Sequence, residues 1–178
     1  MLFAAILVAG NAWAQARKTS ISCNSDSAGD VTVSFKISGV GNGNLCVVSA
    51  GTYGADCACK NGGGNCPSAA NKQSTTDAVG AGQAFQSTNG QIVGSETLTA
   101  PGESVCTDLN FNCPGGQTLI LAQLITPAPV SVQVFGPGDF TQSGNACTPN
   151  NNAIPVRSGT CTTKAQAIVF NRQCAALF

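Results

Sequence analysis

Residues 31–37 read Val-Thr-Val-Ser-Phe-Lys-Ile, and this stretch decides the fold class. In an extended chain the four apolar residues, at the odd positions, share one face, and Thr32, Ser34 and Lys36 share the other. A strict alternation of this kind is typical of a half-buried β-strand, with its apolar face on a core and its polar face toward water. We therefore expect a sheet with one covered face.

Further strand signals, separated by turns of Gly, Pro and Asn, continue along the chain. Asn89-Gly90 is the strongest of these turns, because both residues accept a positive φ, and it predicts a hairpin between residues 78–88 and 91–100. Residues 117–126 are apolar on both faces, which predicts a strand inside a sheet. Seven or eight such strands predict an all-β, disulfide-rich antiparallel β-sandwich, either immunoglobulin-like or jelly-roll-like. The other expected segments are strands at 45–59, 130–134 and 160–171, loops at 39–44, 60–67 and 101–116, and a long polar excursion at 140–158.

The first sixteen residues match the pattern of a secretory signal peptide. A short apolar run is followed by small residues at Ala12, Ala14 and Ala16, which suits cleavage after Ala14 or after Ala16. The basic segment that usually precedes such a run is missing, and the alternative is a buried N-terminal helix. We predict a signal peptide at 1–16 and a single domain at 17–178, secreted to the extracellular space. No later stretch has the eighteen or so apolar residues that a membrane helix needs, so no membrane insertion is expected.

All ten cysteines follow the predicted signal peptide. An even number of cysteines behind an export signal indicates a disulfide framework, in which each bridge contributes about 2–4 kcal/mol. The alternative is a soft-metal site at Cys57, Cys59 and Cys66, because residues two apart on a strand share a face and could converge on one ion. An oxidising compartment favours disulfides, which we predict for Cys23, Cys46, Cys57, Cys59, Cys66, Cys106, Cys113, Cys147, Cys161 and Cys174.

Four segments resemble, in order and spacing, a family of small secreted bacterial β-sandwich proteins of unassigned function, common in actinobacteria. The resemblance spans roughly residues 31–126 and implies a secreted sandwich without lending any activity. In that family the cysteines before the Gly-Gly loop and before the Pro-Gly-Gln turn look like a pair, which implies a disulfide between Cys59 and Cys113. The eight other cysteines and the excursion at 140–158 depart from the family. The matching segments are FKISGVGN (35–42), CKNGGGNCPSAANK (59–72), NGQIVGS (89–95) and CPGGQTLIL (113–121).

The sequence is poor in catalytic residue types. It holds no histidine, which removes the commonest general base and the Ser-His and Cys-His nucleophile pairs. Asp26 and Asp30 could offer oxygens to calcium, but their segment lacks the length and the closing glutamate of an EF-hand loop, so a solvated turn is favoured. A glycosidase needs two carboxylates across a cleft. The spacing nominates no such pair among Asp26, Asp30, Asp56, Asp77, Glu96, Glu103, Asp108 and Asp139. We therefore predict no catalytic residue, and we also predict no metal and no cofactor.

Charged and aromatic residues are scarce. Eight basic and eight acidic residues give a net charge of zero, and no basic cluster is present to attract nucleic acid. A neutral surface lacks long-range repulsion between copies, which is compatible with self-association. After cleavage the chain would keep no tryptophan and one tyrosine, Tyr53, which disfavours a stacking lectin site and leaves a hydrogen-bonding one open.

These features lead to three hypotheses of function. The first is a secreted, non-enzymatic structural or surface-interaction protein, one form of which is a self-assembling filament or coat subunit whose partner is a second copy of the chain. Strand addition at a sheet edge could join the copies, with the polar segment 17–22 as the added strand. The alternative is a secreted binding module for a glycan, a small ligand or a host protein. The third is a hydrolase with a carboxylate pair.

Overall fold

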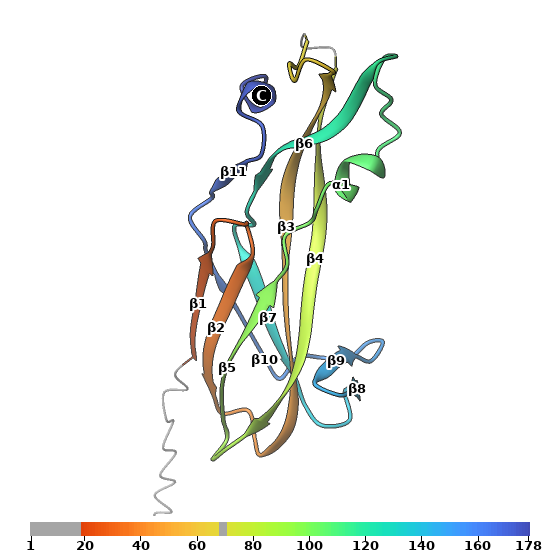
Figure 1. Cartoon of the computed structure of the whole chain (residues 1–178). Coiled ribbons are helices and arrows are strands. Elements are labelled where there is room, and N and C mark those ends of the chain that lie inside the picture. Colours follow the sequence, from red (N-terminus) through yellow and green to blue (C-terminus); the bar gives the residue numbers. More distant parts are fainter. Residues whose placement is uncertain (1–18, 68–70) are drawn as a thin grey trace, which may run out of the picture.

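The computed structural model describes residues 19–67 and 71–178, so the predicted signal peptide at 1–16 lies outside the described residues. The chain folds as the predicted antiparallel β-sandwich (Figure 1). The smaller sheet has the order β1 (Thr19–Ser25), β2 (Val31–Ser38), β5 (Gln91–Leu98). The larger sheet contains β3 (Gly43–Asn61), β4 (Lys72–Ser87), β6 (Gln117–Ile125), β7 (Val130–Phe135), β8 (Phe140–Ser143), β9 (Ala146–Pro149), β10 (Arg157–Cys161) and β11 (Ala167–Val169).

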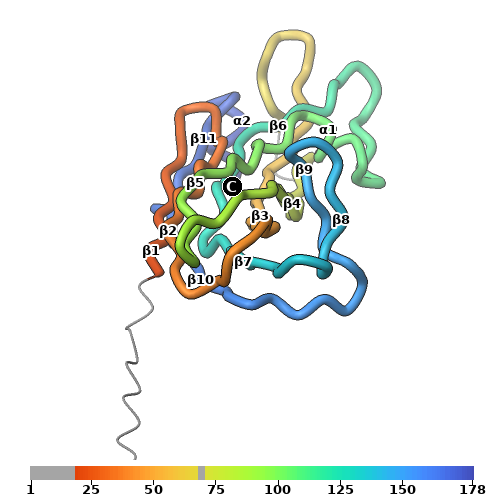
Figure 2. The backbone as a smooth tube through the Cα atoms, turned by 90° about the horizontal axis from the view of Figure 1, so that it is seen from below, coloured from red at the N-terminus to blue at the C-terminus, as the bar shows by residue number. Residues whose placement is uncertain are grey.

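The long strand β3 is the axis of the larger sheet. β4 pairs with one edge of β3, from Ala58↔Lys72 to Gly43↔Ser87. The other edge pairs first with β7 and then with β6, and β10 and β11 extend the sheet beyond those two strands. In the end-on view of Figure 2, β1, β2 and β5 lie on one side of β3 and β4, and β8 and β9 lie on the other.

The core lies between the sheets, as the alternation in residues 31–37 predicts. Val31 and Val33 are completely buried, whereas the polar residues between the apolar ones are exposed. Phe35 of β2 meets Phe85 of β4 edge to face, with 5.1 Å between the ring centroids. Burial of large apolar side chains contributes about 1.5–3 kcal/mol each, so this layer of side chains holds the two sheets together.

The Asn89-Gly90 turn forms as predicted, but the ladder expected beside it does not. Both residues have a positive φ, 52° and 68°, and the flanking Thr88 and Gln91 form an isolated bridge. Beyond that bridge β4 stays in the larger sheet and β5 crosses to the smaller one. The expected pairing of 78–88 with 91–100 is wrong because each strand has one apolar face, and the two faces become buried against each other across the sandwich.

Two further predicted segments change, and one is confirmed. The strand expected at 117–126 lies inside the larger sheet, between β3 and β11. The polar excursion at 140–158 is not a loop throughout, because it contains the β8–β9 hairpin. The single strand expected at 160–171 is wrong: it is interrupted where the Gln166 N–H donates to the Thr126 hydroxyl.

Two short helices, α1 (Ser104–Thr107) and α2 (Arg172–Ala175), complete the fold, and within the described part no helix is long and apolar enough to cross a membrane.

The segment expected to be free for strand addition, residues 17–22, is already paired where the structure describes it. Thr19 begins β1, which pairs with β2 of the same chain. Ile21 packs against the core, and the disulfide Cys23–Cys161 ties β1 to β10 in the other sheet. Because β1 is already part of the smaller sheet of its own chain, it is not a free strand that could be added to another copy.

Candidate functional site

All ten cysteines form disulfides. The structure joins Cys59 to Cys113, the pair that the family resemblance implies. The three cysteines considered as soft-metal ligands go to three different partners, so their sulfurs are not gathered around one ion. The other four pairs are Cys23–Cys161, Cys46–Cys147, Cys57–Cys106 and Cys66–Cys174.

The carboxylates considered for calcium hold a turn. Asp26 Oδ1 accepts hydrogen bonds from the N–H groups of Ala28 and Asp30, and Asp30 Oδ1 accepts one from the Ala100 N–H. The hydroxyl of Tyr53 donates to a carbonyl oxygen of the same turn. Burial, and then the nearby charges of Asp30 and Asp26, raise the pKa of Tyr53 to about 12. This cluster therefore connects the β1–β2 turn to β3 and to the residues that follow β5.

A polar row crosses the outer face of the larger sheet. Asp56 of β3 lies opposite Ser74 of β4 on one side and Gln123 of β6 on the other. One carboxylate oxygen accepts a hydrogen bond from the Ser74 hydroxyl at 2.6 Å, and the other accepts one from the Gln123 side-chain amide. Only 5% of Asp56 is exposed. The row (Ser74, Asp56 and Gln123) thus holds an oriented, nearly buried carboxylate.

A β-bulge beside Asp56 sets the direction of Gln123. The register between β3 and β6 shifts between Asp56 and Cys57, so Ala122 has no direct partner on β3. Ala122 packs in the small cluster beneath α2, and Gln123, the next residue, reaches the carboxylate. Bulges commonly redirect a side chain in this way, and they occur more often than expected beside functional sites.

The polar row forms the floor of a shallow hollow of about 590 Å³. Its apolar lining comes from Phe178 and Ile125, which are 42% and 37% exposed. The Nζ atom of Lys72 lies 5.0 Å from the centre of the Phe178 ring and donates to the carbonyl oxygen of Leu177, so it holds the last residues over the sheet. Gln73 also lines the hollow. The lining therefore combines one carboxylate, one ammonium group, two amides and one hydroxyl with two apolar side chains.

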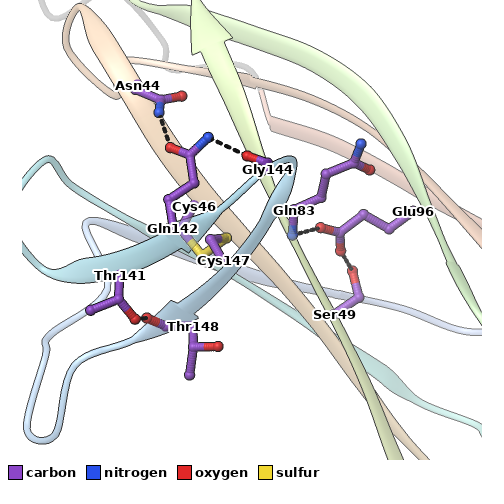
Figure 3. Close-up of a disulfide and its surroundings, with 10 residues drawn as sticks. All are labelled: Asn44, Cys46, Ser49, Gln83, Glu96, Thr141, Gln142, Gly144, Cys147 and Thr148. Atoms are coloured by element: carbon purple, nitrogen blue, oxygen red, sulfur yellow. Dashed lines mark hydrogen bonds between the residues drawn. A yellow bond between two sulfur atoms is a disulfide. The ribbon is translucent and has the colours of Figure 1, made fainter.

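A second nearly buried carboxylate, Glu96 of β5, bridges the two sheets (Figure 3). Its Oε2 accepts a hydrogen bond from the Ser49 hydroxyl of β3 at 2.7 Å, and its Oε1 accepts one from the Gln83 N–H of β4 at 2.9 Å. Burial raises the pKa of Glu96 to about 7, although the hydrogen bonds from Ser49 and Gln83 act in the opposite direction. Glu96 also lines a small hollow of about 240 Å³, with Asn145 among the other lining residues. The groups that bind Glu96 are a hydroxyl and an amide, so the geometry is that of a structural bridge.

The β8–β9 hairpin is anchored beside Glu96 (Figure 3). The disulfide Cys46–Cys147 joins β3 to β9, and Gln142 accepts a hydrogen bond from the Asn44 amide and donates one to the Gly144 carbonyl oxygen. The hairpin covers one end of the outer face, and α2 covers the other. Between these covers the outer face stays open, with exposed small residues at Ala50, Thr52, Thr76, Ala78 and Gly80.

Comparisons with protein-family models, with curated proteins and with solved structures find no match for this chain. No functional site can therefore be transferred to this chain from a relative.

Sequence reasoning did not single out Asp56 and Glu96 among the eight carboxylates. The surroundings of Asp56 could have done so, because it stands between Ala55 and Cys57 in a mostly apolar strand, where a buried charge without hydrogen-bond partners would be costly. The structure does not bring the two carboxylates together, because Asp56 lies on the outer face and Glu96 lies between the sheets.

Proposed function

We propose that this is a secreted, non-enzymatic surface-interaction protein whose copies associate through the open edge of β4. The observation that carries the proposal is that edge. β4 pairs with β3 along its whole length but with β9 only at Gln83↔Ala146. Among the strands that the structure describes, none other pairs with residues 72–82. Unpaired backbone groups at a sheet edge are a template for strand addition.

The composition of this edge supports pairing with a second copy. Proteins usually protect an edge with lysines, proline or a bulge. β4 has no proline, and its only lysine, Lys72, lies at its first position. Asp77 is the only other charged residue in the strand, and the net charge of the chain is zero, so little repulsion opposes the approach of another copy. Apart from Gln73, the exposed positions within residues 72–82 carry small or short side chains: Ser74, Thr76, Ala78 and Gly80.

Two features support the non-enzymatic and extracellular parts of the proposal. The sequence has no histidine, and its two nearly buried carboxylates are engaged in hydrogen bonds within the sheet or between the sheets. Five disulfides are typical of an oxidising environment outside the cell. A glycosidase or esterase activity that is abolished by Glu96→Gln or Asp56→Asn would contradict the non-enzymatic part.

Sedimentation velocity over micromolar to millimolar protein tests the association. We expect the sedimentation coefficient to rise with concentration. The double substitution Thr76→Lys/Ala78→Lys should keep the protein monomeric, because it places like charges on the edges that meet and both positions are exposed.

The matched control is Thr32→Lys/Ser34→Lys, which adds the same charge at exposed positions of β2, the central strand of the smaller sheet. We expect this control to associate like the original protein. Monomeric behaviour of the original protein at millimolar concentration, or equal loss of association in both variants, would contradict association through β4.

A further inference from the structure

We propose that the hollow over the polar row binds a sugar ring of an uncharged glycan. The inference does not rest on association between copies. Lys72, Gln73 and Ser74 of β4 belong to both regions, but the hollow uses their side chains on the face of the sheet, whereas the proposed contact between copies uses the backbone groups of the β4 edge. The hollow brings together five polar side chains and two apolar ones from β3, β4, β6 and the chain end. None of these strands suggests a binding site when its sequence is considered alone.

The polar row has the hydrogen-bonding capacity that sugar hydroxyls require. A carboxylate offers about four lone-pair sites. Asp56 uses one on each oxygen for Ser74 and Gln123. It lines the hollow although only 5% of it is exposed, and we assign its remaining acceptor sites to the hydroxyls of a sugar ring. The carboxylate is already oriented by its neighbours, so little side-chain entropy is lost when a ligand binds. Lys72 and Gln73 line the same hollow and supply donors for the oxygens of the ligand.

The apolar lining suits the C–H face of a sugar ring. Phe178 and Ile125 are both partly exposed in the hollow. The Phe178 ring is held in place by the Lys72 ammonium group on its face. Phe178 is the one aromatic residue that lines the hollow, so it provides the aromatic surface there.

The balance of charge favours an uncharged ligand. Asp56 and Lys72 are the two charged residues of the lining, so an anion would meet the carboxylate and a cation would meet the ammonium group. Among the described residues, no group of three or more histidine, cysteine or carboxylate side chains is placed to hold a metal ion, in the hollow or elsewhere. A peptide backbone lying over the hollow is disfavoured, because β3 is paired with both β4 and β6 there and the face of the sheet would offer it only side chains.

Isothermal titration calorimetry of the whole protein with three neutral trisaccharides, cellotriose, mannotriose and chitotriose, tests the proposal. We expect at least one of them to bind with a millimolar or tighter Kd. Asp56→Asn and Phe178→Ala should each weaken that binding by about tenfold or more, because one removes a charged acceptor and the other removes the aromatic surface. Phe178 is 42% exposed, whereas Asp56 is 5% exposed, so the Phe178 variant should fold even if the Asp56 variant does not.

The matched controls are Asp108→Asn and Phe170→Ala, which make the same changes at exposed residues outside the hollow. We expect both controls to bind like the original protein. Absence of binding to all three trisaccharides would overturn the proposal. Binding that survives in the folded Phe178→Ala variant, or that falls equally in the controls, would place the ligand elsewhere and would also overturn it.

Discussion

Phe85 of the larger sheet occupies the space that a side chain at Gly94 of the smaller sheet would fill. A Cβ atom at position 94 would lie 2.4 Å from Cε1 of Phe85 and 3.2 Å from Cζ of Phe35. Gly94 is the register partner of Phe35 on the neighbouring strand. The sheets therefore interlock at this point, where one inserts an aromatic ring and the other lacks a side chain.

The first prediction concerns this contact. Gly94→Ala should lower the free energy of unfolding by about 1–3 kcal/mol, because the methyl group displaces a ring in a packed core. Urea unfolding measures the change. Gly102→Ala is the control, since a Cβ there meets no atom within 4 Å, and it should change stability by less than about 0.5 kcal/mol. Equal effects at the two positions would show that the interlock does not contribute.

The second prediction concerns Glu96. Its pKa is raised from 4.5 to about 7, so between these pH values the folded protein binds more protons than the unfolded chain. The contribution of Glu96 to the free energy of unfolding should therefore be highest below about pH 4.5. It should fall as the pH rises toward 7 and level off above that. The total fall should be about 3 kcal/mol at most.

Glu96→Gln should remove this fall and make the protein more stable than the original above pH 7. A glutamine can still accept from the Gln83 N–H and can donate to the Ser49 hydroxyl. Glu103→Gln, at an exposed carboxylate, is the control and should retain the pH dependence. Chemical unfolding at a series of pH values measures all three proteins, and an unchanged pH profile in Glu96→Gln would contradict the assignment.

The third prediction concerns the disulfide between Cys23 and Cys161, which joins a strand of the smaller sheet directly to a strand of the larger sheet. Cys23→Ser/Cys161→Ser should lower the free energy of unfolding by about 2–5 kcal/mol. It should also speed hydrogen exchange in β1, because that strand is then held only by its pairing with β2 and by the packing of side chains such as Ile21 on the core.

The matched variant is Cys66→Ser/Cys174→Ser, which removes a bridge of similar loop length, 108 residues against 138. Chain entropy alone predicts nearly equal losses of stability for the two bridges. Hydrogen exchange in β1, relative to exchange in β3, separates the local effect from the global one. Equal relative exchange in the two variants would show that Cys23–Cys161 does not secure β1.

Local patterns predicted those parts of the fold that depend on residues near one another in the chain. The alternation at 31–37 predicted which residues of β2 are buried, because side chains of an extended chain alternate between its faces. Asn89-Gly90 predicted a turn, because both residues accept a positive φ. The pairing of the flanking strands was not predictable from that turn, since the turn allows them either to pair or to pass into facing sheets.

The candidate site likewise depends on contacts that local sequence does not predict. Asp56, Gln123 and Phe178 lie far apart in the sequence, and no spacing between them predicts contact. They meet because β3 and β6 are neighbours in one sheet and because the chain end returns over that sheet.

The sequence by itself determined the all-β class, the half-buried strand at 31–37 and the turn at Asn89-Gly90, because alternation and backbone preference are local properties. Only the tertiary structure decided that β4 and β5 belong to different sheets, that β4 keeps an open edge and that Asp56 lies in a polar hollow. The physical reason is that strand partners are chosen by the burial of whole faces across the sandwich, to which all the strands contribute together.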